Sequence, residues 1–242
     1  MKTINKIHVK DFLANIGVDY KEINYGMFDR IGESLARRYR APDSPEYRKY
    51  GMGYRANYER GIVIYYLIKE FGLETFLEIG FGRGYATACA LKSFHDHGIN
   101  GRVVTMAPDL DNSMLNAMAS AIPEVNINQS NFHPLAATSN KVKQQTDIFN
   151  EMYDLIYVDG DHSEEGVRQD CSYVKDIWSQ YLLFDDYHTE EKESFIQCRK
   201  PIDELELDGE LIIMDRRLFM DERQLSDEEI TYGQMLFSKN KQ

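Results

Sequence analysis

Acidic side chains stand directly after two apolar segments in the C-terminal half of the chain. The segments lie in the stretches DLIYVDGDH and YLLFDDYH, and the polar residues at their ends are Asp159, Asp161, His162, Asp185 and Asp186. If the two segments are neighbouring strands of a parallel sheet, these side chains converge on one edge. Buried carboxylates are costly unless something compensates their charge, and a hard divalent cation is then a natural partner.

Asp159, Asp185 and Asp186 are the candidate ligands of that cation. Oxygen ligands favour Mg²⁺ or Ca²⁺, with Mn²⁺ as a further choice. The metal would bind an acceptor hydroxyl, lower its pKa and so generate an oxyanion nucleophile. His162 is suited to take up the proton near neutral pH, and Asp161 is the rival base or an additional ligand. The competing interpretation makes these residues loop caps and helix N-terminal charges.

Alternating glycines follow another apolar segment, in FLEIGFGRGYATACAL. Glu78 stands near the end of the predicted strand, and Gly80, Gly82 and Gly84 precede a predicted helix. Glycines permit positive φ and let the backbone approach a ligand closely. The helix N-terminus offers free amides to a ligand carboxylate, and the carboxylate of Glu78 can receive an ammonium group.

Three other interpretations of the glycine stretch compete. A dinucleotide site would place its third glycine one residue later and a pyrophosphate on the helix, which Glu78 would repel. A P-loop is excluded because no Gly-Lys-Ser/Thr follows. A tight turn between strand and helix, without any ligand, stays as the plain alternative.

The glycine stretch resembles the first motif of class I S-adenosylmethionine (SAM)-dependent methyltransferases, and the resemblance extends from about Tyr54 to the C-terminus. It implies SAM as cofactor, with donor-binding residues at Glu78, Gly80, Phe81, Gly82, Gly84 and Asp159.

Two further donor contacts follow from the resemblance. The family usually ends its second strand with an acid that holds the ribose, whereas this chain has Met106 and Ala107 there. Asp109 is the candidate for the role, with a turn or helix N-cap as the alternative. Ser130 stands where the resemblance expects an adenine contact.

The acidic segments resemble those of metal-dependent O-methyltransferases, of both the catechol and caffeoyl-CoA type and the sugar-modifying type. In these enzymes an aspartate after the fourth strand and an acidic pair after the fifth hold the metal. The resemblance carries this set over to Asp159, Asp185 and Asp186. Where the catechol type has a lysine base, this chain has His162.

Apolar runs and amphipathic segments alternate along most of the chain, which indicates an α/β fold. Strands are predicted at Thr75–Ile79, Arg102–Met106, Val125–Asn128, Leu155–Val158, Tyr181–Phe184, Leu211–Met214 and Arg217–Met220. Helices are predicted at Tyr54–Phe71, Tyr85–His97, Ser113–Ala121, Glu164–Ile177 and Ser194–Glu204. We expect a Rossmann-like, mostly parallel, seven-stranded sheet with helices on both faces and an antiparallel last strand. Residues 1–53 are predicted to form a helical cap or lid, and residues 54–242 the SAM-binding domain.

Composition and charge limit the kinds of partner that we expect. The net charge of −12 argues against nucleic acid, and no apolar run reaches the ~18 residues that a membrane span needs. The charged first ten residues do not resemble a signal peptide, so we expect a cytoplasmic protein with reduced cysteines. Self-association into a homo-oligomer stays open.

The sequence thus predicts metal-assisted, SAM-dependent methylation of a small-molecule hydroxyl. Methylation of a nitrogen or a carboxyl group without metal is an alternative. Two further alternatives are a non-catalytic donor-binding or assembly protein of the same fold and a hydroxylase-like relative. The last would need two histidines and a carboxylate around iron, for which His162, His188 and Asp185 are the candidates.

Overall fold

The computed structural model describes residues 4–36, 59–189, 197–213 and 232–239. Within these ranges eight strands form one sheet, in the order β4-β3-β2-β5-β6-β8-β7-β1. The strands are β1 (Asn5–His8), β2 (Thr75–Ile79), β3 (Arg102–Met106), β4 (Asn131–Leu135), β5 (Tyr153–Val158), β6 (Trp178–His188), β7 (Gly209–Ile213) and β8 (Tyr232–Ser238). All neighbouring pairs are parallel except the two that β8 makes, with β6 and with β7.

The predicted fold class is confirmed, including helices on both faces and antiparallel pairing of the last strand, but the described sheet has eight strands and not the predicted seven. Strands β1 and β8 both lie where no strand was predicted. The third predicted strand, Val125–Asn128, is wrong: this segment leads into a 3₁₀ turn (Ile127–Gln129), and the strand begins at Asn131. The β4 sequence NFHPL contains Pro134, and a proline within a segment counts against the prediction of a strand there. Pro134 is tolerated because β4 is an edge strand. The predicted strand Arg217–Met220 lies outside the described residues.

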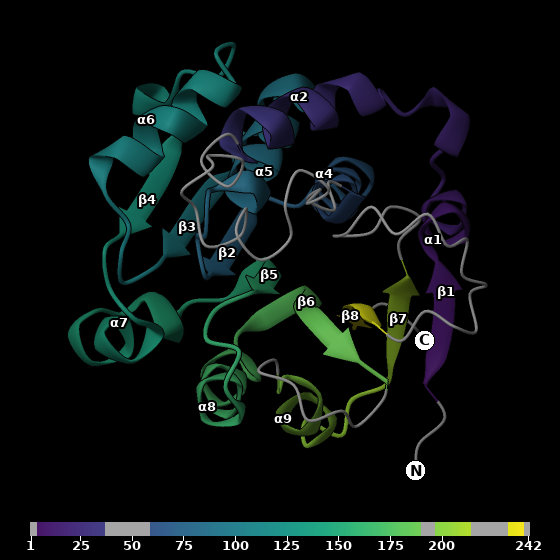
Figure 1. The fold of residues 1–242 in the computed structure, drawn as a ribbon, viewed down its shortest axis with the longest axis vertical. Coiled ribbons are helices and arrows are strands. Elements are labelled where there is room, and N and C mark those ends of the chain that lie inside the picture. Colours follow the sequence, from purple (N-terminus) through teal and green to yellow (C-terminus); the bar gives the residue numbers. More distant parts are fainter. Residues whose placement is uncertain (1–3, 37–58, 190–196, 214–231, 240–242) are drawn as a thin grey trace, which may run out of the picture.

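Helices cover both faces of the sheet (Figure 1). The helices longer than a single 3₁₀ turn are α1 (Val9–Asn15), α2 (Tyr25–Ala36), α4 (Glu59–Phe71), α5 (Tyr85–His97), α6 (Asn112–Ala121), α7 (Ser139–Gln145), α8 (Glu164–Val174) and α9 (Arg199–Asp203). Helices α2, α4, α5 and α6 lie together on one face, and α7, α8 and α9 lie on the other.

Each face of the sheet has its own apolar core, because side chains alternate along a strand. On β5, Leu155 and Tyr157 pack toward α4 and α5, whereas Ile156 and Val158 pack toward α7, α8 and α9. This alternation decides on which side of the sheet each polar residue at a strand end lies.

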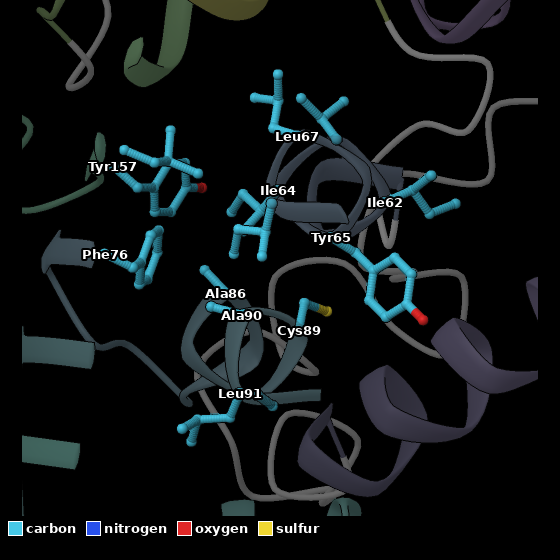
Figure 2. Packing of buried hydrophobic residues seen from close by; sticks show 14 of the residues in the cluster. Ile62, Ile64, Tyr65, Leu67, Phe76, Ala86, Cys89, Ala90, Leu91 and Tyr157 are labelled. Atoms are coloured by element: carbon cyan, nitrogen blue, oxygen red, sulfur yellow. The ribbon is translucent and has the colours of Figure 1, made fainter. Parts of the chain in front are cut away.

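Helices α4 and α5 approach closely at Gly61. A Cβ at Gly61 would lie 2.4 Å from the sulfur of Cys89, so a larger residue would force the two helices apart. Farther along, Ile64 of α4 points toward the small side chains Ala86 and Ala90 of α5 (Figure 2). This close packing fixes where the first turn of α4, which carries Arg60, meets the sheet.

The N-terminal segment is built into the main sheet. Strand β1 pairs in parallel with β7, and Leu13 of α1 is fully buried in the core that contains α4 and α5. The three cysteines are buried free thiols. In the described part of the chain, no helix has the length and apolarity to cross a bilayer.

Candidate active site

The glycine turn between β2 and α5 lies at the carboxyl edge of the sheet. Gly80, Gly82 and Gly84 have φ values of +99°, +52° and +79°, a region that favours glycine. The amide of Gly80 donates to the carbonyl oxygen of Met106 at 2.9 Å, which ties the turn to the end of β3. A Cβ at Gly82 would meet nothing within 4 Å, so the turn presents bare backbone to open space there.

A cavity of about 470 Å³ lies beside this turn, within the size range of small-ligand sites. Its lining comes from the last residues of β2 and β3, from the residues after β2, β3, β4 and β5, and from α8. Four carboxylates line it, those of Asp109, Asp159, Asp161 and Asp170. A cavity so rich in acids favours a ligand that carries positive charge.

Asp109 and Asp111 have separate roles. The side chain of Asp111 caps α6 by accepting from the amide of Met114 at 2.8 Å. The cap is therefore supplied without Asp109, which is exposed and lines the cavity. The structure thus leaves Asp109 in a position to accept hydrogen bonds from a ligand.

Glu78 is buried inside the sheet and is not among the cavity-lining residues. Thr87 of α5 and Thr105 of β3 both donate to its Oε2. Burial raises the pKa of Glu78 to about 8, although the two hydroxyls oppose the rise. Glu78 therefore joins β2, β3 and α5 beneath the glycine turn. Phe81 is also buried beneath the turn, and Gly84 is the N-cap of α5.

Ser130 lies at the amino end of β4, at the edge of the sheet opposite the glycine turn. The misplaced third strand explains this position, since a strand ending at Asn128 would have put Ser130 at the carboxyl edge. The cavity is instead lined there by Ala137, Thr138 and Ser139, which follow β4. None of these three residues was predicted from the sequence, and neither was Asp170, whose Oδ1 accepts from the Ser139 hydroxyl at 2.6 Å. Burial raises the pKa of Asp170 to about 6.

Asp159, Asp185 and Asp186 do come together, around two cationic side chains. Arg60 donates from Nη1 to Oδ2 of Asp185 and, at 2.8 Å, from Nη2 to Oδ1 of Asp186. The Nε2 of His162 lies 3.1 Å from Oδ1 of Asp159 and 3.6 Å from Oδ2 of Asp186. We call these five residues the Arg60 cluster.

A bulge in β6 lets two consecutive aspartates reach the same guanidinium. Successive side chains of a regular strand point to opposite faces. Leu183 belongs to the core on the α4 side and Phe184 to the other, so Asp185 points toward α4 as expected. The pairing with β8 shifts between Phe184 and Tyr187, and Asp186 has a φ of +52°. Asp186 is thereby turned back toward Arg60.

Hydrogen bonds and burial set the charges in the cluster. The hydrogen bond to Asp159 raises the pKa of His162 to about 9, so His162 is protonated at neutral pH. Burial raises the pKa values of Asp159 and Asp185. Burial acts in the same direction on Asp186, but Arg60 and His162 outweigh it and hold the pKa of Asp186 below its ordinary value.

The cluster as folded does not fit the predicted metal site. Oδ2 of Asp185 receives Arg60 and, at 2.8 Å, the hydroxyl of Tyr157, and Asp186 receives Arg60. Among the described residues, one group has ligand atoms within 4.8 Å of one another, namely Asp159, His162 and Asp186. In that group the imidazole nitrogen already faces Asp159, and Arg60 already contacts Asp186.

Asp161 lies at the cavity, where its Oδ1 accepts from the amide of Ser163 at 2.9 Å. Arg60 is not among the site residues predicted from the sequence. Arg60 precedes Asp185 by 125 residues, and no local pattern connects a helix start to a distant strand end.

Comparison with known proteins agrees with this architecture. Residues 77–187 match the family model described as a methyltransferase domain. No curated protein matches the chain in sequence. Among solved structures, an O-methyltransferase from Bacillus cereus in complex with S-adenosylhomocysteine (SAH) is similar, with a TM-score of 0.57 and 14% identity over 96% of this chain and 97% of that one.

Two more solved structures share the fold. An O-methyltransferase from Streptomyces achromogenes involved in tomaymycin synthesis, in complex with SAM, has a TM-score of 0.55 and 12% identity, covering 95% of both chains. An SAH-bound methyltransferase from Podospora anserina has a TM-score of 0.54 and 14% identity over 98% of this chain and 99% of that one. The chain thus shares the fold of these SAM- and SAH-bound methyltransferases, and residues 77–187 match the methyltransferase-domain model.

Proposed function

We propose that this chain is a SAM-dependent methyltransferase that methylates an oxygen atom of a small-molecule acceptor. The observation that carries the proposal is the position of Asp159. Its side chain contacts His162 in the Arg60 cluster, and the same residue lines the cavity beside the glycine turn. A donor in the cavity and an acceptor at the cluster would therefore meet at Asp159.

The cavity fits the donor in charge and in shape. When bound, SAM supplies an electrophilic methyl group on a sulfonium cation. The bare backbone at Gly82 allows close approach, and the four aspartates of the lining suit a ligand with a sulfonium and an ammonium group. Ile79, Met106 and Ala137 provide apolar contact area. In this arrangement Asp109 is the residue that we assign to the ribose hydroxyls.

The Arg60 cluster can accept the proton of an acceptor hydroxyl. The cluster has three carboxylates and only two cationic side chains, so it can take up one more proton and become neutral. His162 already carries its proton at neutral pH, and we therefore assign the role of base to Asp159. Burial strengthens Asp159 as a base by raising its pKa, and His162 orients the carboxylate.

The metal-assisted form of this reaction makes Asp159, Asp185 and Asp186 ligands of Mg²⁺. It would place the metal beside the Arg60 guanidinium, and the two cations would compete for the same carboxylates. The proposed reaction does not depend on that arrangement. The iron set of a hydroxylase-like relative lacks support, since His188 is absent from the described group of close ligand atoms.

Calorimetric titration of the full chain with SAM, in EDTA and in Mg²⁺, tests the proposal. We expect one SAM per chain in both buffers. Incubation with a panel of phenols, catechols and sugars should then release SAH, and Asp159→Asn should lose turnover even at a SAM concentration that saturates it. Absence of SAM binding would refute the proposal. Binding without SAH release across the panel would favour the non-catalytic donor-binding protein.

A further inference from the structure

We infer that the Arg60 guanidinium is the resident cation of this site and stands in place of the divalent metal. The inference deepens the proposed function, on which it rests, by assigning the charge compensation of the acids to the protein itself. Arg60 is a positioning residue in this scheme, because it contacts Asp185 and Asp186 and no reacting atom.

The guanidinium bridges two carboxylates as a metal ion would. Its two terminal nitrogens donate to different aspartates, so one planar group holds both at fixed separation. The side chains are 15%, 0% and 10% exposed for Arg60, Asp185 and Asp186, which leaves little water to compensate the acids. The close contact of α4 and α5 at Gly61, the next residue, fixes Arg60 in this position.

Arg60 as it is placed opposes the binding of a divalent cation in the site. Asp185 uses Oδ2 for Arg60 and Tyr157, and its Oδ1 is buried without a hydrogen-bond partner among the described residues. An ion on the remaining group would lie beside the guanidinium on Asp186 and would have to displace Asp159 from His162. Repulsion between the two cations in a buried site opposes that arrangement.

The bulge in β6 supports the same assignment. A positive φ at a non-glycine residue is unfavourable and persists only where the surroundings require it. The positive φ of Asp186 turns its carboxylate toward Arg60. The ion pair with the guanidinium is therefore sufficient to explain this backbone conformation.

Binding of Mn²⁺, followed by the electron paramagnetic resonance of the free ion, tests the inference on the full chain. The variants are Arg60→Met, the conservative Arg60→Lys, and Arg102→Met as matched control, since Arg102 pairs with Glu151 at the amino edge of the sheet. We expect Arg60→Met to bind one Mn²⁺ per chain at least tenfold more tightly than the wild type, Arg60→Lys and Arg102→Met. Adding Asp186→Asn to Arg60→Met should abolish the gain.

The outcomes separate clearly. Stoichiometric Mn²⁺ binding by the wild type that Asp186→Asn removes would overturn the inference, and this measurement needs no Arg60 variant to fold. The inference would also be overturned if folded Arg60→Met bound Mn²⁺ as weakly as the wild type does, because the acids would then not form a cation-binding site. SAM titration of the same samples reports separately on the proposed function, since the Mn²⁺ signal does not depend on donor binding or turnover.

Discussion

Gly80 and Asp159 lie so close that a Cβ on Gly80 would come within 1.9 Å of the carbonyl oxygen of Asp159. The amide of Asp159 in turn donates to the carbonyl oxygen of Ile79 at 2.8 Å. The glycine turn after β2 and the acidic loop after β5 are therefore in direct backbone contact. A change in one of them must displace the other.

Substitution of the turn glycines tests this contact. Gly80→Ala should cost more than about 3 kcal/mol of unfolding free energy, because backbone atoms block the new methyl group. Gly82→Ala should cost only about 1–2 kcal/mol, the price of a positive φ where space is open. Urea denaturation of both variants gives the comparison. Equal losses would contradict the described contact.

Asp109 and Asp111 should show opposite effects when each is changed to alanine. Asp109→Ala should weaken SAM binding by roughly tenfold or more while leaving stability unchanged, because a charged hydrogen bond to the ligand is lost. Asp111→Ala should keep the affinity but lose about 1 kcal/mol of stability with the α6 cap. Calorimetry and thermal unfolding of the two proteins measure both quantities. A loss of affinity in Asp111→Ala alone would reverse the assignment.

The buried carboxyl of Glu78 should make stability depend on pH. Its pKa is raised to about 8 in the folded chain, so the folded state binds more protons than the unfolded one between about pH 4.5 and 8. Stability should therefore fall as pH rises through this window, by at most about 1.4 kcal/mol per pH unit from this group. Glu78→Gln should gain stability over the wild type toward pH 8–9 and show no such gain near pH 4.5. The exposed Glu74→Gln serves as control, and a difference in Tm that stays constant with pH would contradict the prediction.

Leu13 tests whether the N-terminal segment unfolds with the sheet. Its side chain is fully buried in α1, within the core shared with α4 and α5. Leu13→Ala should cost about 2–5 kcal/mol and preserve a single unfolding transition, whereas the exposed Asp11→Asn should change stability by less than about 0.5 kcal/mol. A separate early transition, followed by calorimetry, would show instead that the segment is an independent cap.

Local patterns in the sequence predict the elements that carry strong signals. Helix α5 has the predicted bounds, since glycines stand at both of its ends. Strand β4 could not be predicted, because an edge position tolerates Pro134 and the sequence does not reveal which strand lies at an edge. Strand β1 is short and precedes its partner β7 by about two hundred residues, a pairing for which no local signal exists.

The candidate site also has parts that the sequence predicts and parts that it does not. The convergence of Asp159 and Asp185 follows from parallel strands, whose carboxyl ends meet at one edge. Asp186 joins them only through the bulge in β6, which the sequence does not indicate. The neutralising group could not be predicted, because Arg60 reaches the acids through the packing of α4 on α5. Similarly, the burial of Glu78 depends on Thr87 and Thr105, whose hydroxyls converge only in the folded chain.

The bulge in β6 means that the acidic pair cannot be transplanted as a sequence motif. Grafted onto a straight strand, Asp185 and Asp186 would point to opposite sides, and a guanidinium would find only one of them. Straightening β6 without removing a residue would likewise reverse the facing of Tyr187, which now packs in the core on the α8 side. What a homologue must share to bind in this way is the path of the backbone, which an alignment of residue types does not record.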